Sequence, residues 1–219
     1  MRVAKTGKYD NSNDIIVKKF DKVEPFDRTV ILPTPASEVK FIKKVEKIVR
    51  SSEEYKEFIK YLKEYIDMTY CSYFNGVTTK GSRKVSIHIH HEPFTLYDLV
   101  QIVMSKWQAQ DKPLSHLLVA EEVCKIHYQG RTGLIPLSAT VHSLVHSGKI
   151  FIPLQNLYGR YSEFVEEYGA YIPDEILEVL EVKVKKSREL TEEDTSILEK
   201  KFVYLEVDGM TFPQPIEED

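Results

Sequence analysis

The chain has 219 residues, of which 42% are hydrophobic and 29% charged, so it can bury a sizeable core and has the composition of a globular protein. The formal net charge of -4 argues against a protein whose whole surface coats nucleic acid, although a local basic face is compatible with it. Apolar runs are too short to span a membrane, and the N-terminus lacks an apolar signal segment. The two cysteines, Cys71 and Cys124, form no CxxC pair, so we expect a reducing, cytoplasmic setting.

Residues 1–82 are expected to form extended segments followed by helices. Short apolar runs at 14–17 and 29–32 favour extended backbone. Ser37 is a candidate N-cap for a helix that ends near Val49. A second helix is predicted at 53–68, because apolar residues recur there at spacings of three and four and form one stripe.

The middle of the chain is expected to combine a strand with several capped helices. Thr95 is followed three residues later by Asp98, which is a capping-box pattern, and Ser115 and Ser138 are further candidate N-caps. The predicted segments are a strand at 84–91, helices at 95–110 and 115–130, an apolar segment at 133–137 and a helix at 138–148.

The C-terminal part, residues 155–219, is predicted to be a helical extension that packs on the preceding core. Helices are expected at about 160–182, with a break near Pro173, and at 191–202, followed by a polar tail. Acidic residues are concentrated in this part, so it is the least suited to contact a polyanion. The chain has no internal repeat and no low-complexity linker, so we expect one continuous domain.

All seven histidines lie between residues 88 and 146, and two groups of them have spacings suited to metal binding. On a strand, His88 and His90 point to one face and His91 to the other, although a distortion at the strand end could bring His90 and His91 to one ion. On a helix, His142 and His146 lie one turn apart on one side and can share an ion. The two histidines between these groups are interpreted as surface or core residues; they are His116 and His127.

The segments 86–93 (SIHIHHEP) and 133–148 (GLIPLSATVHSLVHSG) together resemble HNH endonucleases, in the variant of the colicin DNases and many phage proteins. In that family a His-His pair ends the first strand, an Asn follows, and two histidines lie on the closing helix. Gly133 occupies the position of the Asn. The resemblance implies an α+β fold with a ββα-metal core at 83–154, a helical insertion at 95–130 and helical additions at both ends. It also favours a phage origin.

The resemblance implies a role for each of five histidines. His90, His142 and His146 correspond to ligands of one divalent ion. Three neutral imidazoles suit zinc or a nickel-type transition ion, and magnesium or manganese are further candidates during turnover. His91 corresponds to the general base. His88 lies where the family often has a glutamate near the active site, and it is a second candidate catalytic residue.

Basic residues near these segments are candidates for binding the substrate backbone. Arg83 and Lys84 lie at the start of the first strand, and Arg131 precedes the apolar segment at 133–137, where each can meet a phosphate. Because Gly133 has no side chain to orient His91, its backbone carbonyl is a candidate for that role.

Three functions are compatible with these features. The first is a metal-dependent HNH-like endonuclease that hydrolyses phosphodiester bonds, with DNA as the expected partner. The alternative is a catalytically inactive HNH-like metal-binding module that binds nucleic acid or a protein. In that case His90, His91, His142 and His146 form a closed site, as in structural zinc sites. The third is a metal-free helical interaction protein.

Overall fold

The computed structural model describes residues 30–32, 34–74, 76–80 and 85–189, together with the backbone of two strands at 202–207 and 210–215. The extended segment predicted at 14–17 and most of the helix predicted at 191–202 lie outside these residues. The segment predicted at 29–32 has no regular secondary structure where it is described.

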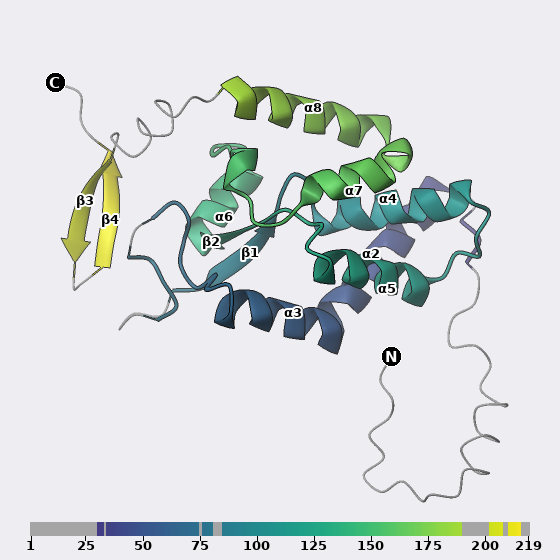
Figure 1. Ribbon diagram of the computed structural model, residues 1–219, viewed down its shortest axis with the longest axis horizontal. Coiled ribbons are helices and arrows are strands. Elements are labelled where there is room, and N and C mark those ends of the chain that lie inside the picture. Colours follow the sequence, from purple (N-terminus) through teal and green to yellow (C-terminus); the bar gives the residue numbers. More distant parts are fainter. Residues whose placement is uncertain are drawn as a thin grey trace, which may run out of the picture.

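The described elements are mostly helical, with two small antiparallel sheets (Figure 1), which confirms the α+β class. They are α2 (Pro35–Ser51), α3 (Glu53–Glu64), β1 (Ile87–His91), α4 (Leu96–Ala109), α5 (His116–Tyr128), β2 (Leu134–Ser138), α6 (Ala139–His146), η1 (Leu154–Asn156), α7 (Tyr161–Tyr168), η2 (Gly169–Tyr171), α8 (Asp174–Glu189), β3 (Phe202–Val207) and β4 (Met210–Pro215).

Side-chain caps fix where the central helices begin. The predicted capping box of Thr95 and Asp98 is present, and the Ser115 and Ser138 side chains each accept a hydrogen bond from the backbone of the next helix. The cap predicted at Ser37 is wrong. Thr34 caps α2, and Ser37 lies three residues inside, where its hydroxyl completes the capping box.

Strands β1 and β2 pair antiparallel although two helices separate them in the sequence. His90 lies opposite Ile135, and His91 lies opposite Leu134. Beyond His91 the pairing continues through the Glu92 N–H, which donates to the Gly133 carbonyl at 3.0 Å. All five residues of β2 are buried. Helix α6 follows β2 directly and packs on both strands.

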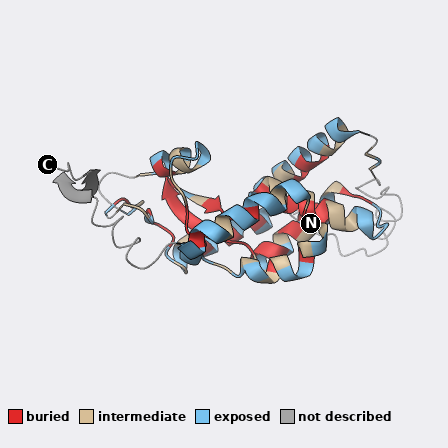
Figure 2. Cartoon of the chain, turned by 90° about the horizontal axis from the view of Figure 1, so that it is seen from above, coloured by how far each residue is buried: buried red, intermediate tan, exposed pale blue. Residues whose placement is uncertain are grey.

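Two hydrophobic clusters meet at β2. The larger cluster joins side chains of α2, α3, α4, α5, α7 and α8, and β2 contributes Leu134 to it. The smaller cluster contains Ile87 of β1, Ile135 and Leu137 of β2, and Val141 of α6. Figure 2 shows the buried faces of the helices turned toward one another around this interior. Helices α4 and α5, predicted as an insertion, therefore form part of the main core.

The C-terminal part confirms the helices predicted at about 160–182, which are α7 and α8 with a break near Pro173, but it also contains a strand pair that was not predicted. Residues 202–207 and 210–215 form the antiparallel pair β3–β4, with Val207 opposite Met210. The sequence of β3, FVYLEV, is rich in aromatic and β-branched residues that favour strands, and Asp208-Gly209 is a dipeptide typical of two-residue hairpin connections. Among the described residues, no helix combines the length and apolarity needed to cross a membrane.

Gly133 is required by the close approach of two backbones. A Cβ atom built there would lie 1.9 Å from the Glu92 carbonyl oxygen, which is itself backbone. We therefore expect Gly133→Ala to destabilise the protein by roughly 2 kcal/mol or more through overpacking. In a domain of this size the Tm would fall by roughly 4–8 °C.

Gly169→Ala is the matched control for thermal unfolding. A Cβ atom at Gly169 meets nothing within 4 Å, and its φ of -53° suits any residue. An equal loss of Tm in both variants would show that the contact with Glu92 is not what restricts position 133.

Candidate metal centre

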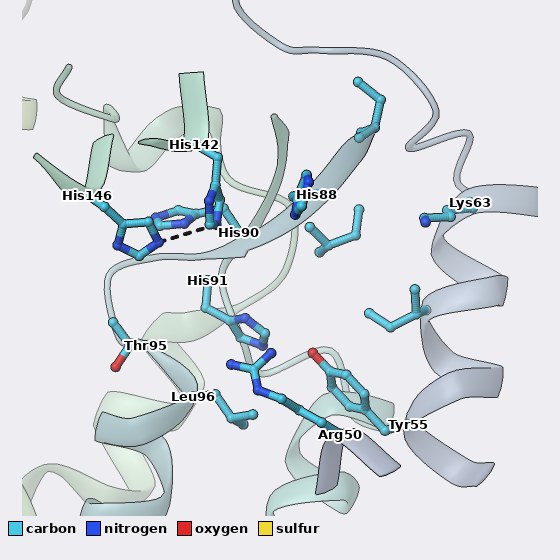
Figure 3. Close-up of a pocket in the computed structure, with 13 residues that line it drawn as sticks. Arg50, Tyr55, Lys63, His88, His90, His91, Thr95, Leu96, His142 and His146 are labelled. Carbon is cyan, nitrogen blue, oxygen red and sulfur yellow. Dashed lines mark hydrogen bonds between the residues drawn. The ribbon is translucent and has the colours of Figure 1, made fainter. Parts of the chain in front are cut away.

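Three of the predicted metal ligands converge at the junction of β1 and α6. His90 is buried on β1, whereas His142 is half-buried and His146 exposed on α6. Each offers a ring nitrogen, and these three atoms all lie within 4.8 Å of one another. The three rings face one another in Figure 3. The structure thus contains a histidine cluster that could hold a metal ion.

The local sequence explains this convergence. Ser138 ends β2 and caps α6, so the helix begins directly beside the strand pair. Val141 is fully buried in the smaller cluster and anchors the helix. His142 and His146 are four residues apart and therefore share the helix side that faces β1, where His90 projects.

Two of the three donor atoms lie at a spacing suited to a shared metal ion. The Nε2 atoms of His142 and His146 lie 3.3 Å apart. Imidazole nitrogens bound at about 2.0–2.1 Å in a tetrahedral site are about 3.3–3.4 Å apart. The Nε2 atom of His90 is buried and makes no well-formed hydrogen bond; its polar neighbour is Glu92 Oε2, at 3.4 Å. Burial, together with the neighbouring His146, His90 and His88, lowers the pKa of His142 to about 4, so its ring is neutral and free to bind a cation near pH 7.

A buried carboxylate lies behind His90. Glu92 Oε2 is 3.4 Å from His90 Nε2, and Glu92 also forms an ion pair with Lys183 of α8. Lys183 donates a second bond to the Pro93 carbonyl. Burial alone would raise the pKa of Glu92, but the contacts with His90 and Lys183 outweigh it and the pKa is lowered. Glu92 therefore stays ionised beside the centre.

His88 and His91 occupy different surroundings. His88 is exposed on the same face as His90; its ring stacks on His142 at 5.2 Å, and Ser86 Oγ lies 3.0 Å from its Nε2. His91 lies on the opposite face of β1, directed toward Arg50 (Figure 3). The predicted strand-end distortion does not occur, because β1 stays paired with β2 through His91. His91 is therefore not a fourth member of the cluster.

His91 is held by a residue that was expected to be merely surface or core. Its Nε2 lies 2.9 Å from Nε2 of His127 in α5, and both rings are buried. The Gly133 carbonyl, predicted to orient His91, instead accepts the Glu92 N–H. The sequence did carry a signal: His127 follows Val119 and Val123 at spacings of four, which places a polar ring on the buried side of its helix.

The predicted phosphate contacts are not assembled here. Arg131 is engaged by carboxylates, with its Nε 3.6 Å from Glu163 and its Nη1 bonded to Glu167, so its charge is already compensated. The other two predicted cations lie outside the described residues; they are Arg83 and Lys84.

Two cations that the sequence did not single out line the histidine pocket. The pocket has a volume of about 380 Å³, and residues from both faces of β1 line it. The three clustered histidines and His91 therefore all border the same pocket. Arg50 of α2 and Lys63 of α3 lie on its helical side (Figure 3). Arg50 ends a basic stretch of the sequence, 40–50, and that stretch was the available signal.

Fold and site together define a mixed α+β protein, largely helical, with a histidine cluster that could hold a metal ion. Residues 2–209 match the family model of the bacteriophage G278-like virion proteins, and the chain belongs to that family. No curated protein and no solved structure matches the chain.

Removing one clustered histidine should abolish stoichiometric metal binding. We expect His142→Ala to weaken zinc or nickel binding by at least roughly 100-fold, since it takes away one of three protein ligands. Isothermal titration calorimetry of chelator-treated protein measures this loss. His116→Ala is the control, because His116 lies against Phe41, away from the cluster. Equal affinity in both variants would exclude the cluster as the binding site.

The buried His127 should make the metal-free protein acid-sensitive. Burial lowers its pKa to about 4, against roughly 6.5 in an unfolded chain. Between these values the unfolded state binds more protons. Stability is therefore full above about pH 6.5 and is lost as the pH falls toward 4, by about 3 kcal/mol from this group. Urea unfolding at several pH values measures the slope, and His127→Leu should reduce it; an unchanged slope would contradict this account.

Proposed function

We propose that this virion protein is a metal-dependent endonuclease with an HNH-type ββα-metal core that hydrolyses phosphodiester bonds in DNA. The observation that carries the proposal is the convergence of His90 with His142 and His146. The order β1, β2, α6 supports a ββα core, since α6 follows β2 without a loop and packs on both strands. The match to a phage virion family supports the phage origin that the resemblance favours.

The number of ligands supports catalysis over a purely structural site. Structural zinc sites are closed by four protein ligands, whereas catalytic sites have three and keep a position for water or substrate. Among the described residues the cluster has three members. A closed site of four histidines would need His91, whose ring lies on the other face of β1 and bonds to His127.

Within the pocket, the protein residues have separable tasks. A divalent ion held by the three histidines would stabilise charge on a phosphoryl oxygen and on the leaving oxygen. His91 borders the same pocket and is neutral near pH 7, because burial, His127 and the charge of Arg50 lower its pKa well below the usual range. A neutral imidazole can accept a proton from the attacking water.

Arg50 and Lys63 are the cations best placed for a phosphate group. Arg50 is largely exposed and pairs only loosely with Glu46, at 3.6 Å, so it can reach another anion. Lys63 borders the pocket from α3, across from the histidines. In a chain of net charge -4, such a local pair of cations can attract a polyanion that the remaining surface does not. We assign to these two residues the role first expected of Arg83, Lys84 and Arg131.

A second candidate function is a metal-binding module without catalysis, which binds nucleic acid or a protein. The observation in its favour is Gly133. It stands where the HNH family has its Asn, and the neighbouring backbone leaves no room for a side chain there. Metal binding alone does not separate the two candidates, so the test must measure cleavage.

Plasmid cleavage by the full chain tests the proposal, with magnesium, manganese, nickel and zinc each supplied. We expect the wild type to cut. His91→Ala should lower kcat by roughly 100-fold or more while metal binding persists, because a general base contributes about 10²–10⁴ to the rate. His142→Ala should lose both cleavage and metal.

The control is again His116→Ala, which should cut at the wild-type rate. Metal in the wild type and in His91→Ala with cleavage in neither would refute the nuclease and leave the binding module. Cleavage by His91→Ala at the normal rate would refute the role of His91.

A further inference from the structure

The second histidine pair, His91 with His127, has a hydrogen-bond order that the structure determines. The Nδ1 atom of His127 lies 2.7 Å from the Val123 carbonyl oxygen. A carbonyl only accepts, so Nδ1 carries the hydrogen. A neutral imidazole has a single N–H, which leaves Nε2 of His127 as an acceptor.

The proton of His91 follows from that assignment. Its Nε2 lies 2.9 Å from the acceptor Nε2 of His127 and must donate. The lone pair of His91 is then on Nδ1. Burial lowers the pKa of His127 to about 4, so its ring is uncharged near pH 7. The hydrogen bonds therefore run in series from the helix backbone through His127 to His91 at the pocket.

Packing against aromatic side chains fixes the orientation of the His127 ring. His127 has no exposed surface and lies edge-on to Tyr55 at 5.4 Å and to Phe58 at 5.5 Å, both from α3. Its ring cannot turn without displacing these aromatic rings. His91 sits between this fixed partner and the pocket that it lines.

The position that orients the base in HNH nucleases has no such group in this chain. A side chain at Gly133 would collide with the Glu92 carbonyl, and the Gly133 carbonyl bonds to the Glu92 N–H. His127 reaches His91 from α5, an element of the main core, and supplies a hydrogen-bond acceptor of its own.

We infer that His127 is the positioning residue of His91: it holds His91 as the Nε2–H tautomer and leaves Nδ1 as the basic atom for the pocket. The inference rests on the proposed function for its catalytic meaning, while the tautomer itself is a property of the folded chain. His127 acts through His91 and does not contact substrate.

Nitrogen-15 NMR of the histidine rings tests the assignment without any activity. In the wild-type protein near pH 7 we expect His91 to show a protonated Nε2 and an unprotonated Nδ1, with the reverse pattern for His127. In His127→Leu, His91 should lose this single tautomer and show an average of the two. Because the first measurement needs no substitution, a variant that fails to fold does not prevent the test. Observation of the Nδ1–H tautomer at His91 in the wild type overturns the inference.

Cleavage kinetics then connect the tautomer to function. His127→Leu should reduce kcat by roughly 10–100-fold, the usual effect of removing an outer partner, with KM little changed. His127→Gln keeps an acceptor oxygen and should recover part of the loss. A change in KM with kcat equal to that of the wild type overturns the positioning role, and so does a variant in which neither parameter changes. If the wild type does not cut although its tautomers are as expected, the nuclease proposal fails and the assigned hydrogen-bond order stands.

Discussion

The pairing of β1 with β2 is the constraint on which the site depends. A strand sends alternate side chains to opposite faces, so a regular ladder separates neighbouring histidines. His90 therefore faces α6, and His91 faces the helical core. Because the ladder continues through Leu134 and, by the Glu92 N–H, to Gly133, neither ring can swing to the other side. One short strand thus supplies one member of the histidine cluster to one face and a neutral, hydrogen-bonded imidazole to the other.

The electrostatics on the two faces differ for the same reason. Around His90 there is a buried carboxylate, Glu92, whose charge is balanced by Lys183 from α8. A cation bound at the cluster would find that negative charge nearby. On the His91 side the charged neighbour is Arg50, whose charge lowers the pKa of His91 further, and burial keeps both His91 and His127 uncharged. The two faces of the strand pair therefore carry different charges: a carboxylate paired with a lysine lies beside the histidine cluster, and an arginine lies beside the neutral rings. One pocket borders both faces.

The histidine cluster and most of the helices could be predicted from the sequence, the cluster with the help of the family resemblance. Helical spacing predicted that His142 and His146 share a side, and strand alternation predicted that His90 and His91 diverge, as they do. What local spacing cannot show is which distant element covers each face. The contact of His91 with His127 joins residues 36 positions apart, and it exists because α5 packs on α2 and α3. The ion pairs of Arg131 could not be predicted for a similar reason, since its carboxylate partners lie in α7.

The stretch between the two strands was predicted as an insertion into a small metal-binding core, but its helices form part of the main hydrophobic cluster. Helices α4 and α5 contribute buried side chains to the main cluster together with α2, α3 and α7, and the strand pair joins that cluster through Leu134. A core of three short elements has little apolar surface of its own to bury, so it gains stability from this larger cluster. Because α5 also carries His127, the element that stabilises the strand pair is the one that fixes the His91 ring. The family match over residues 2–209 agrees with this view, since it extends across all of these elements as one unit.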